Sequence, residues 1–277
     1  MNKNSKIYIA GHRGMVGKTL YNLLKNNGYK NLLTRTSNQL DLTKQKAVEN
    51  FFKIENPEYI FLCAAKVGGI MANMNDLSGF LYNNIMIAMN IIHSAYKYKT
   101  KKLLNLGSSC IYPRNCHQPM QEKHLLTSSF EPTNEGYAIA KVAALKLCEY
   151  YNKEHSTNFI SLMPCNLYGV NEKFDTYNSH VLAALIMKFH QAKTKNKKSI
   201  TLWGTGKPKR EFLYVEDLAK ACIHFMKNVS AKNMDNVFVN IGAGQEISIK
   251  ELAEIIKNTV QFKGKIKWDH SKPDGMS

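Results

Sequence analysis

KIYIAGHRGMVG, the stretch formed by residues 6–17, decides the fold class of this 277-residue chain. Residues 6–10 predict a buried strand, and apolar side chains recur at helical spacing between 18 and 26. The glycines between them are spaced GxxGxxG rather than GxGxxG. A strand, a glycine turn and a helix in this order are typical of dinucleotide-binding sites. Gly11 permits the tight turn, Gly14 lets the backbone approach a pyrophosphate, and Gly17 lets the helix pack closely on the strand.

The glycine turn and the segment after the next strand indicate which dinucleotide binds. A strand is predicted at 31–33, and Arg35 follows it where an NAD-selecting acid is expected, about 20 residues past the glycines. Guanidinium groups form paired, charge-assisted hydrogen bonds with phosphate, so Arg35 and Arg13 together favour a 2′-phosphate. The sequence therefore predicts NADP(H) rather than NAD(H). In the turn itself, the predicted cofactor contacts are Gly11, His12, Arg13, Gly14, Met15, Val16 and Gly17.

Strands and helices alternate along the rest of the chain. Apolar strands are predicted at 59–63, 102–106 and 158–163, and two strands that return to the same sheet are predicted at 212–215 and 237–240. This alternation predicts an α/β fold with a doubly wound parallel sheet. Ligands bind at the carboxyl ends of the strands of such sheets. Further cofactor contacts are therefore expected at Arg35, Asp41, Leu42, Ala64, Ala65, Leu106, Gly107, Ser108 and Ser109.

Tyr137 and Lys141 form the centre of the predicted catalytic set. Because they are four residues apart on a predicted helix, they lie on one face, one turn from each other. A phenol has a reference pKa of about 10, and a neighbouring ammonium lowers it. We expect Lys141 to lower the pKa of Tyr137 in this way, so that the pair passes a proton to or from a carbonyl oxygen. Ser108, which follows the strand at 102–106, can donate a hydrogen bond to the same oxygen.

Seven longer motifs span nearly the whole chain. They are GHRGMVG at 11–17, AAKVGGI at 64–70, LGSSCIYP at 106–113, EPTNEGYAIAK at 131–141, MPCNLYG at 163–169, NSHV at 178–181 and WGTGKPKREFLYVED at 203–217. With these motifs the chain resembles the extended short-chain dehydrogenase/reductases and, among them, the GDP-L-fucose synthases.

The resemblance implies NADPH-dependent 3,5-epimerisation and 4-keto reduction of a GDP-4-keto-6-deoxy-hexose. Tyr137 would protonate the ketone oxygen, Ser108 would hydrogen-bond it, and Lys141 would hold the nicotinamide ribose. For the epimerisation, the family pattern supplies Cys110 as the base and His180 as the acid. From the residues alone, Cys110 can equally be a small buried thiol, and His180 can be a cap at the start of a helix.

The second half of the chain carries the residues that would bind the nucleotide sugar. A helix is predicted at 181–190, a strand at 200–203, and a helix at 249–260 with Ser248 as its N-cap. Core packing is the alternative interpretation of Trp203. By resemblance, the residues near the nicotinamide are Lys141, Pro164, Cys165, Asn166, Leu167 and His180, and those that contact the GDP sugar are Lys188, Trp203, Arg210 and Asp274.

Two lobes follow from this division of roles. We expect residues 1–167 and 213–241 to form the NADP-binding domain, and residues 168–212 and 242–277 to form a smaller lobe that binds the GDP sugar. Members of the family continue for several dozen residues beyond KPDG, which is at 272–275 here. We therefore expect the smaller lobe to be truncated. The resemblance also implies a homodimer formed through two long helices, at 81–96 and 137–155.

Composition limits the classes of partner. Lys and Arg number 38 against 21 Asp and Glu, a net charge of +17, but no nucleic-acid-binding motif is present. We interpret most of this charge as spread over the surface, with a few cations committed to phosphates. The six cysteines lack CxxC or metal-ligand spacing, so we predict free thiols in a reducing compartment and no metal. No apolar run approaches the length of a membrane span, and we expect a soluble cytoplasmic protein that binds neither membrane nor nucleic acid.

Other functions are compatible with the same residues. The close alternative is a C4-only reductase of a related GDP-4-keto sugar, such as a GDP-heptose, which could retain Cys110 and His180. A different class is a non-catalytic protein that senses NADP on the same fold, and the intact Ser108, Tyr137 and Lys141 set argues against it.

Overall fold

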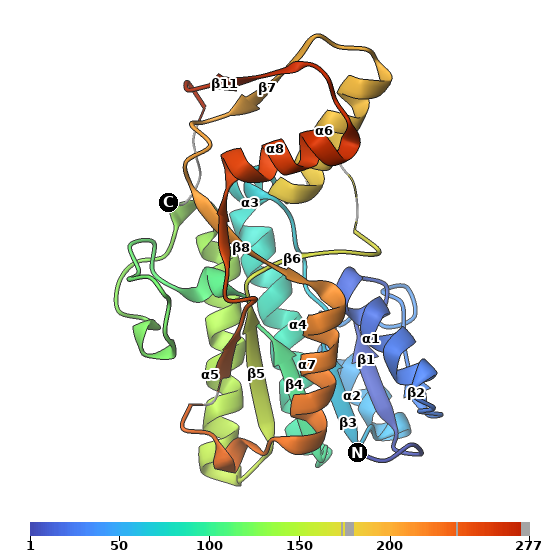
Figure 1. Ribbon diagram of the computed structural model, residues 1–277. Coiled ribbons are helices and arrows are strands. Elements are labelled where there is room, and N and C mark those ends of the chain that lie inside the picture. The colour runs from blue at the N-terminus through green and yellow to red at the C-terminus, as the bar shows by residue number, and fades with distance from the viewer. Residues whose placement is uncertain (173, 175–179, 237, 273–277) are drawn as a thin grey trace.

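A six-stranded sheet forms the centre of the larger part of the molecule (Figure 1). The computed structural model describes residues 1–172, 174, 180–236 and 238–272. All neighbouring strands in this sheet are parallel, which confirms the predicted doubly wound parallel sheet. Their order is β2 (Leu32–Leu33), β1 (Ile7–Ala10), β3 (Tyr59–Leu62), β4 (Lys102–Leu106), β5 (Phe159–Pro164) and β9 (Phe238–Ile241).

Helices cover both faces of this sheet, because successive strand residues point to opposite sides. Tyr8 and Ala10 face a core that also contains side chains of α2 (Gln45–Glu55), α4 (Leu77–Lys97) and α5 (Glu135–His155). Ile7 and Ile9 face the other core, with α1 (Met15–Asn26) and α7 (Val215–Asn228). In Figure 1, α7 and α5 lie on opposite sides of the strands. The order of the strands reverses between β1 and β3, where open α/β sheets bind ligands.

A second, smaller group of elements lies beyond the carboxyl ends of the central strands, at the top of Figure 1. Helices α6 (Val181–Thr194) and α8 (Ile249–Val260) pack on a two-stranded parallel sheet of β7 (Ser199–Trp203) and β11 (Lys265–Asp269). The Ser248 side chain accepts a hydrogen bond from the Glu251 N–H, and the Glu251 carboxylate accepts from the Ser248 N–H. This capping box confirms the predicted N-cap of α8.

A three-stranded sheet connects the two parts and corrects one expectation. It consists of β10 (Glu246–Ser248), β8 (Lys209–Tyr214) and β6 (Asn166–Tyr168). The strand predicted at 212–215 was expected to return to the central sheet, and that prediction is wrong. Strand β9 takes the position beside β5, so β8 pairs with β6 and β10 instead. The remaining elements are short: α3 (Ile70–Asn75), η1 (Ser109–Ile111), η2 (Glu122–His124), η3 (Pro132–Asn134) and η4 (Ala231–Asn233).

The hydrophobic cores follow the same division. Two cores flank the central sheet, and a separate core lies among α6, α8, β7 and β11. Such separate cores are what the predicted two-lobe organisation requires, and its residue boundaries stay a prediction. Within the described part of the chain, no helix combines the length and the apolar character that crossing a membrane needs.

Candidate active site

The glycine turn between β1 and α1 shows why two of its glycines are needed by the fold itself. Gly11 has a φ of +86°, and a Cβ there would lie 2.7 Å from the Ala64 nitrogen. A Cβ on Gly17 would overlap the carbonyl oxygen of Gly11. A Cβ on Gly14 would have ordinary contact with the protein, with its nearest atom 3.5 Å away. Nothing in the described chain therefore requires glycine at this position, and the close approach of a pyrophosphate to Gly14 stays a prediction.

Unfilled hydrogen-bonding groups surround Gly14. Gly14 is the N-cap of α1, no side chain caps this helix, and its first turn contains no acid. The first N–H groups and the positive end of the helix dipole are thus open to an anion. His12 has a buried Nδ1 that makes no hydrogen bond with any described residue, and burial together with the Arg13 charge lowers its pKa. These groups fit the pyrophosphate of a dinucleotide.

Substitution by alanine should have different effects at Gly17 and at Gly14. Gly17→Ala should lower the free energy of unfolding by about 1–3 kcal/mol, because the new methyl group meets the backbone of the turn. Gly14→Ala should change it by less than about 1 kcal/mol but raise the NADPH dissociation constant by about tenfold or more. Denaturant unfolding and fluorescence titration measure the two quantities. Equal loss of stability in both variants would contradict this interpretation of Gly14.

The two arginines expected at the 2′-phosphate differ in their surroundings. Arg35 donates from Nη2 to Glu55 Oε1 at 2.6 Å and from Nη1 to the Thr34 carbonyl oxygen at 2.8 Å. Arg13 is exposed and forms no ion pair within the described ranges of the chain. Arg35 is therefore held in place by Glu55 of α2, whereas the charge of Arg13 is available to a ligand. The role of both residues at a 2′-phosphate stays a prediction.

The segment predicted to border the adenine is ordered by its own hydrogen bonds. The Asp41 carboxylate accepts from the Thr43 N–H and hydroxyl at 2.9 and 2.7 Å, and these bonds lower the pKa of Asp41. Asn90 of α4 donates to the Leu42 carbonyl oxygen at 2.8 Å. Asn90 thus ties Leu42 to α4, and the contact of both residues with adenine stays a prediction.

A buried asparagine that sequence reasoning missed holds the segment after β3. Asn84 of α4 accepts from the Lys66 N–H at 2.7 Å and donates to the Lys66 carbonyl oxygen at 3.0 Å. It thereby pins the chain directly after Ala64 and Ala65, which are expected to face the cofactor. The signal in the sequence is a lone amide within the apolar stripe of a helix, where a buried polar group needs partners.

The carboxyl end of β4 brings Ser108 and Cys110 together. A Cβ on Gly107 would overlap the sulfur of Met163, so the chain leaves β4 in close contact with β5. Ser108 then caps η1, where its Oγ accepts from the Cys110 N–H at 3.3 Å. The predicted contacts Leu106 to Ser109 thus occupy one short segment at the sheet edge where a dinucleotide fold binds its ligand.

Lys141 reaches this segment from α5. Its Nζ donates to the Leu106 carbonyl oxygen at 2.7 Å and lies 5.6 Å from the centroid of the Tyr137 ring. Burial lowers the pKa of Lys141 to about 8, an effect that Cys63 and Cys110 partly oppose. Tyr137 and Lys141 lie on one face of α5, as their spacing predicted, and the structure adds that Lys141 contacts the end of β4.

The pKa of Tyr137 differs from the expectation. Burial raises it well above the usual value for a phenol, and the neighbouring Cys110 adds to the rise. The expected lowering by Lys141 is wrong for this geometry, because removing a phenolate from water costs more free energy than a cation 5.6 Å from the ring centroid returns. Tyr137 is consequently a neutral phenol at physiological pH, which is the form that donates a proton.

Cys110 is half-buried, and cations act on it. Burial raises its thiol pKa, whereas a hydrogen bond with Ser108 and the charges of Lys141 and Arg210 act in the opposite direction. Its interaction with Tyr137 and Lys141 shows that Cys110 belongs to the same cluster. Arg210 of β8 acts on Cys110 through its charge alone, and this contribution is the smallest of those on the thiol.

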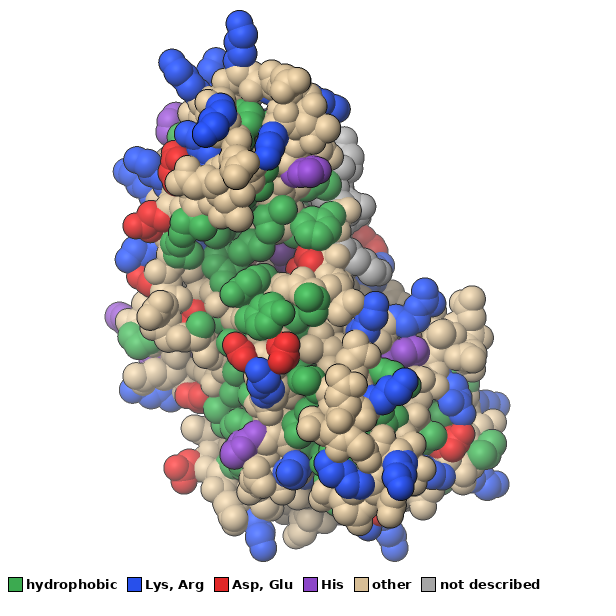
Figure 2. Space-filling view, turned by 45° about the vertical axis from the view of Figure 1, so that its right-hand side comes forward, with side chains coloured by type: hydrophobic (Ala, Val, Ile, Leu, Met, Phe, Trp, Pro, Cys, Tyr) green, Lys and Arg blue, Asp and Glu red, His purple; other side chains and the backbone are tan. Residues whose placement is uncertain are grey.

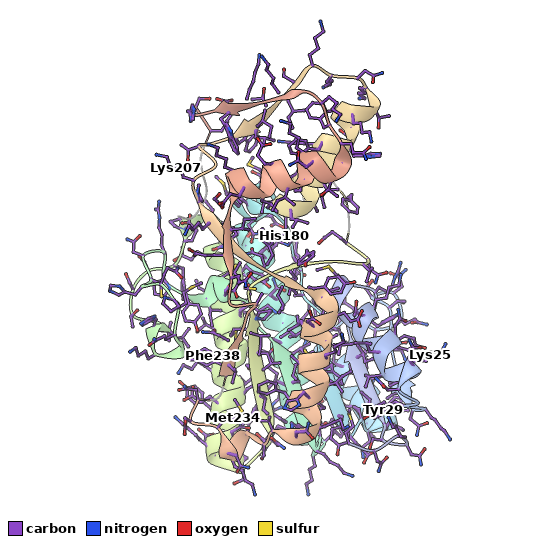
Figure 3. The ribbon with its side chains drawn as sticks, viewed as in Figure 1. Lys25, Tyr29, His180, Lys207, Met234 and Phe238 are labelled. Atoms are coloured by element: carbon purple, nitrogen blue, oxygen red, sulfur yellow. The ribbon has the colours of Figure 1, made fainter. Side chains whose placement is uncertain are left out.

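His180 occupies the start of α6. It is the N-cap residue, and its carbonyl oxygen accepts from the Ala184 N–H at 2.9 Å, whereas its imidazole makes no capping hydrogen bond. The ring is exposed. Figure 3 shows His180 at the level between the α6–α8 pair and the carboxyl ends of the central strands. Its role as an acid stays a prediction.

The turn from β5 into β6 holds the other residues expected near the nicotinamide. The Cys165 N–H donates to the Ile241 carbonyl oxygen at 3.1 Å, and Asn166 Nδ2 donates to the Glu211 carbonyl oxygen at 3.1 Å. Pro164 ends β5 and Leu167 lies in β6, so the four residues border the same sheet edge as Ser108.

Three of the four residues predicted to bind GDP are within the described part of the chain. Trp203 is 52% exposed, so core packing is not its role. The Lys188 ammonium lies 5.5 Å from the centroid of the Trp203 ring, and that of Lys272, which sequence reasoning missed, lies 5.9 Å from it. Arg210 is in β8. Asp274 lies outside the described residues.

Comparison with known proteins places these features in a family. Residues 7–242 match the model of the family described as "NAD dependent epimerase/dehydratase family". The chain belongs to this family.

Within the residues described, no three His, Cys, Asp or Glu side chains gather in a group that could hold a metal ion.

Relatives in the family narrow the resemblance. The chain is 51% identical to "GDP-L-fucose synthase 1" of Arabidopsis thaliana, covering 99% of this chain and 83% of that protein. It is 46% identical to "GDP-L-fucose synthase" of Escherichia coli (strain K12), covering 98% and 86%. Among solved structures, "MlghC, GDP-mannoheptose C4 reductase from Campylobacter jejuni with NADP bound" matches with a TM-score of 0.90 and 38% identity, covering 97% of this chain and 89% of that one. The predicted resemblance to GDP-L-fucose synthases is confirmed.

Proposed function

We propose that this chain is an NADPH-dependent enzyme that epimerises C3 and C5 and reduces the C4 ketone of a GDP-4-keto-6-deoxy-hexose, yielding GDP-L-fucose or a close relative. The observation that carries the proposal is the partly buried cluster in which Cys110 joins Ser108, Tyr137 and Lys141. A reductase needs a proton donor and an oxyanion contact. The thiol beside them adds the base that epimerisation requires. The identity to GDP-L-fucose synthases supports the same conclusion.

The reduction uses the protonated form of Tyr137. When bound, NADPH supplies the hydride that reduces C4. Tyr137 donates its phenolic proton to the ketone oxygen, and Ser108 donates a hydrogen bond to the same oxygen. Lys141, held by the Leu106 carbonyl oxygen, binds the nicotinamide ribose and keeps a positive charge beside the phenolate that remains.

The epimerisation uses the same carbonyl oxygen. Hydrogens on C3 and C5 are acidic because they are α to the ketone. Cys110 in its thiolate form removes one of them, and Ser108 and Tyr137 stabilise the enolate oxygen by hydrogen bonds. His180 returns a proton to the opposite face, which the N–H of a protonated imidazole can supply. The charges of Lys141 and Arg210 favour the thiolate of Cys110 against its burial.

The smaller lobe would hold the GDP part. Lys188 and Arg210 are cations suited to the diphosphate, and the exposed indole of Trp203 offers a flat surface to the nucleotide. Asp274 is proposed on the nucleotide sugar by resemblance alone.

One specific observation favours a second candidate, a C4-only reductase. The GDP-mannoheptose C4 reductase matches the present structure with a TM-score of 0.90. In that case Cys110 would be a packing thiol and the substrate a related GDP-4-keto sugar, such as a GDP-heptose. A protein that only senses NADP would have no use for the catalytic cluster.

One experiment separates these functions. The full chain is mixed with NADPH and GDP-4-keto-6-deoxymannose in D₂O, NADPH absorbance is followed, and the product sugar is characterised by NMR. Oxidation with deuterium at C3 and C5 establishes the epimerase-reductase. Oxidation without deuterium identifies a C4 reductase. NADPH binding without oxidation of any 4-keto sugar tested contradicts both.

Arg13 should decide the preference for NADPH. Arg13→Ala should raise the NADPH dissociation constant by about tenfold to a hundredfold, the loss expected for hydrogen bonds to a charged phosphate, and leave that of NADH unchanged. Fluorescence titration with both cofactors measures the effect. Lys25→Ala removes the same charge from the opposite end of α1 (Figure 3) and should change neither constant. An equal loss of NADH affinity would contradict the assignment.

Two further features complete the proposal. We propose a homodimer formed through α4 and α5, which pack together and leave Tyr82, Ile139 and Tyr150 exposed. We also propose a cytoplasmic location, which the six free cysteines support because thiols persist in reducing compartments.

A further inference from the structure

The two-stranded sheet of the smaller lobe has one buried face and one open face. In the register of the strands, Lys265 lies beside Ser199, Lys267 beside Thr201, and Asp269 beside Trp203. The alternate residues, Ile200, Leu202, Ile266 and Trp268, all belong to or pack on the core that α6 and α8 share. Side chains alternate across a strand. The other set, which contains Lys265, Lys267 and Asp269 of β11 and Ser199, Thr201 and Trp203 of β7, therefore covers the outer face.

This outer face lies in a part of the sequence that is almost free of acids. Residues 181–210 contain eight Lys and Arg and no Asp or Glu, and residues 262–272 contain four Lys and one Asp. Figure 2 shows Lys and Arg side chains projecting from the top of the smaller lobe. We call the following five exposed residues the lysine row: Lys197, Lys198, Lys263, Lys265 and Lys267.

Nothing described neutralises the lysine row. The lysine row comes from two segments of the chain, 197–198 and 263–267. The backbone N–H of Lys265 donates to the Lys198 carbonyl oxygen at 2.9 Å, and this bond holds the two segments together. Over the described ranges, none of the five ammonium groups is paired with a carboxylate; the nearby Lys209 is paired with Glu246. The carboxylate of Asp269 accepts hydrogen bonds from the N–H and the hydroxyl of Ser271, at 3.1 and 2.6 Å.

The row leads to the proposed nucleotide site. Trp203 continues the outer face beyond Thr201, and the ammonium groups of Lys188 and Lys272 lie 5.5 and 5.9 Å from its ring centroid. We propose that the lysine row is an electrostatic guide that directs the diphosphate of the incoming GDP sugar to Trp203. This inference rests on the proposed function, and it adds a surface outside the contacts predicted for the substrate.

Guidance differs physically from tight binding. Lysine residues two apart on a strand are about 7 Å from each other, which is within the screening length of about 8 Å at physiological ionic strength, so their fields add. Exposed, hydrated ammonium groups on flexible side chains contribute little to the free energy of the bound complex. Fields of this kind raise association rates by about 10- to 1,000-fold and act weakly on dissociation.

The test is a pair of double variants of the full chain. K265Q/K267Q removes two charges from the row, and K227Q/K232Q removes two exposed charges at the end of α7 and in η4, by the amino ends of the central strands. Stopped-flow fluorescence gives the association and dissociation rate constants of N-methylanthraniloyl-GDP. At about 20 mM salt, K265Q/K267Q should associate about three- to tenfold more slowly than wild type, and at about 0.5 M salt the difference should vanish. The control variant should match wild type at both.

Three results would overturn the guide. They are an unchanged association rate in K265Q/K267Q, an equal fall in the control, and a change confined to the dissociation rate. Absence of any GDP binding would overturn it as well. The proposed function is tested separately, by turnover. Salt-dependent GDP association without NADPH oxidation would reject the proposed function and keep the guide. NADPH oxidation together with an association rate that neither salt nor K265Q/K267Q changes would reject only the guide.

Discussion

Tyr137→Phe should slow C4 reduction by about a hundredfold to ten-thousandfold, the range typical for loss of a general acid. The phenol is a neutral donor because burial raises its pKa, and the substitution removes that proton while it keeps the ring. Single-turnover oxidation of NADPH with the 4-keto sugar measures the step itself. The NADPH dissociation constant should stay within about twofold of wild type, since the assigned cofactor contacts remain. A variant that keeps more than a tenth of the wild-type rate would show that another group donates the proton.

The pH profile of the wild-type enzyme provides a second readout of the same step. Lys141 has a pKa of about 8, so its ammonium is present below this pH and is lost above it. Reduction should therefore decline as the pH rises through about 8, because the positive charge that stabilises the developing phenolate of Tyr137 disappears. The Y137F variant cannot form a phenolate, so its residual reduction should lose most of this decline. A wild-type rate that is flat from pH 6 to pH 10 would contradict the assignment of Lys141.

Local patterns predicted the parts of the fold that depend on neighbours in the sequence. The glycine turn and the Tyr137–Lys141 face were predicted correctly because backbone geometry and helical spacing act over a few residues. The capping box of Ser248 is of the same kind. The ion pair of Arg35 with Glu55 is different, because it depends on how α2 packs. No rule based on residue spacing predicts that pair.

Features that depend on competition between distant segments were not predictable in this way. Residues 212–215 are apolar enough for the central sheet, yet β9 takes the place beside β5, and β8 therefore pairs elsewhere. Burial raises the pKa of Tyr137, and burial depends on tertiary packing rather than on the four-residue spacing to Lys141. Residues 265–269 alternate charged and apolar side chains, which is the pattern of a half-buried strand. No local pattern, however, identifies β7 as the partner of β11, and this pairing brings Lys272 to Trp203.

Cys110→Ser should separate the two reactions of the proposed enzyme. Exchange of the C3 and C5 hydrogens with solvent should fall by about a hundredfold or more, because a serine hydroxyl does not ionise near neutral pH as a thiol does. Reduction at C4 should stay within about tenfold of wild type, since Tyr137 and Lys141 remain. NMR of the product formed in D₂O measures both, and it should show the reduced sugar without inversion.

Cys116→Ser is the matched control for this substitution. Cys116 lies in the loop after η1, where its sulfur contacts His124 Nδ1 at 3.4 Å, so its loss should affect neither reaction. If the C110S variant exchanges C3 and C5 hydrogens at the wild-type rate, Cys110 is a packing thiol and the C4-only reductase becomes the better function. Loss of both reactions with unchanged NADPH affinity would instead show that Ser108 needs the neighbouring thiol for its position.

The pH dependence of solvent exchange at C3 and C5 tests which group is the base. Burial raises the pKa of the Cys110 thiol, and hydrogen bonds with Ser108 and with the backbone and the charges of Lys141 and Arg210 counter this in part. The thiolate is therefore a minor form near neutral pH, and solvent exchange at C3 and C5 should rise as the pH increases from 6 to 8. Reduction should not rise over the same interval, because it uses the protonated Tyr137. Opposite trends of the two reactions in one active site require two separate titrating groups, and exchange that keeps its rise in the C110S variant would rule out Cys110 as one of them.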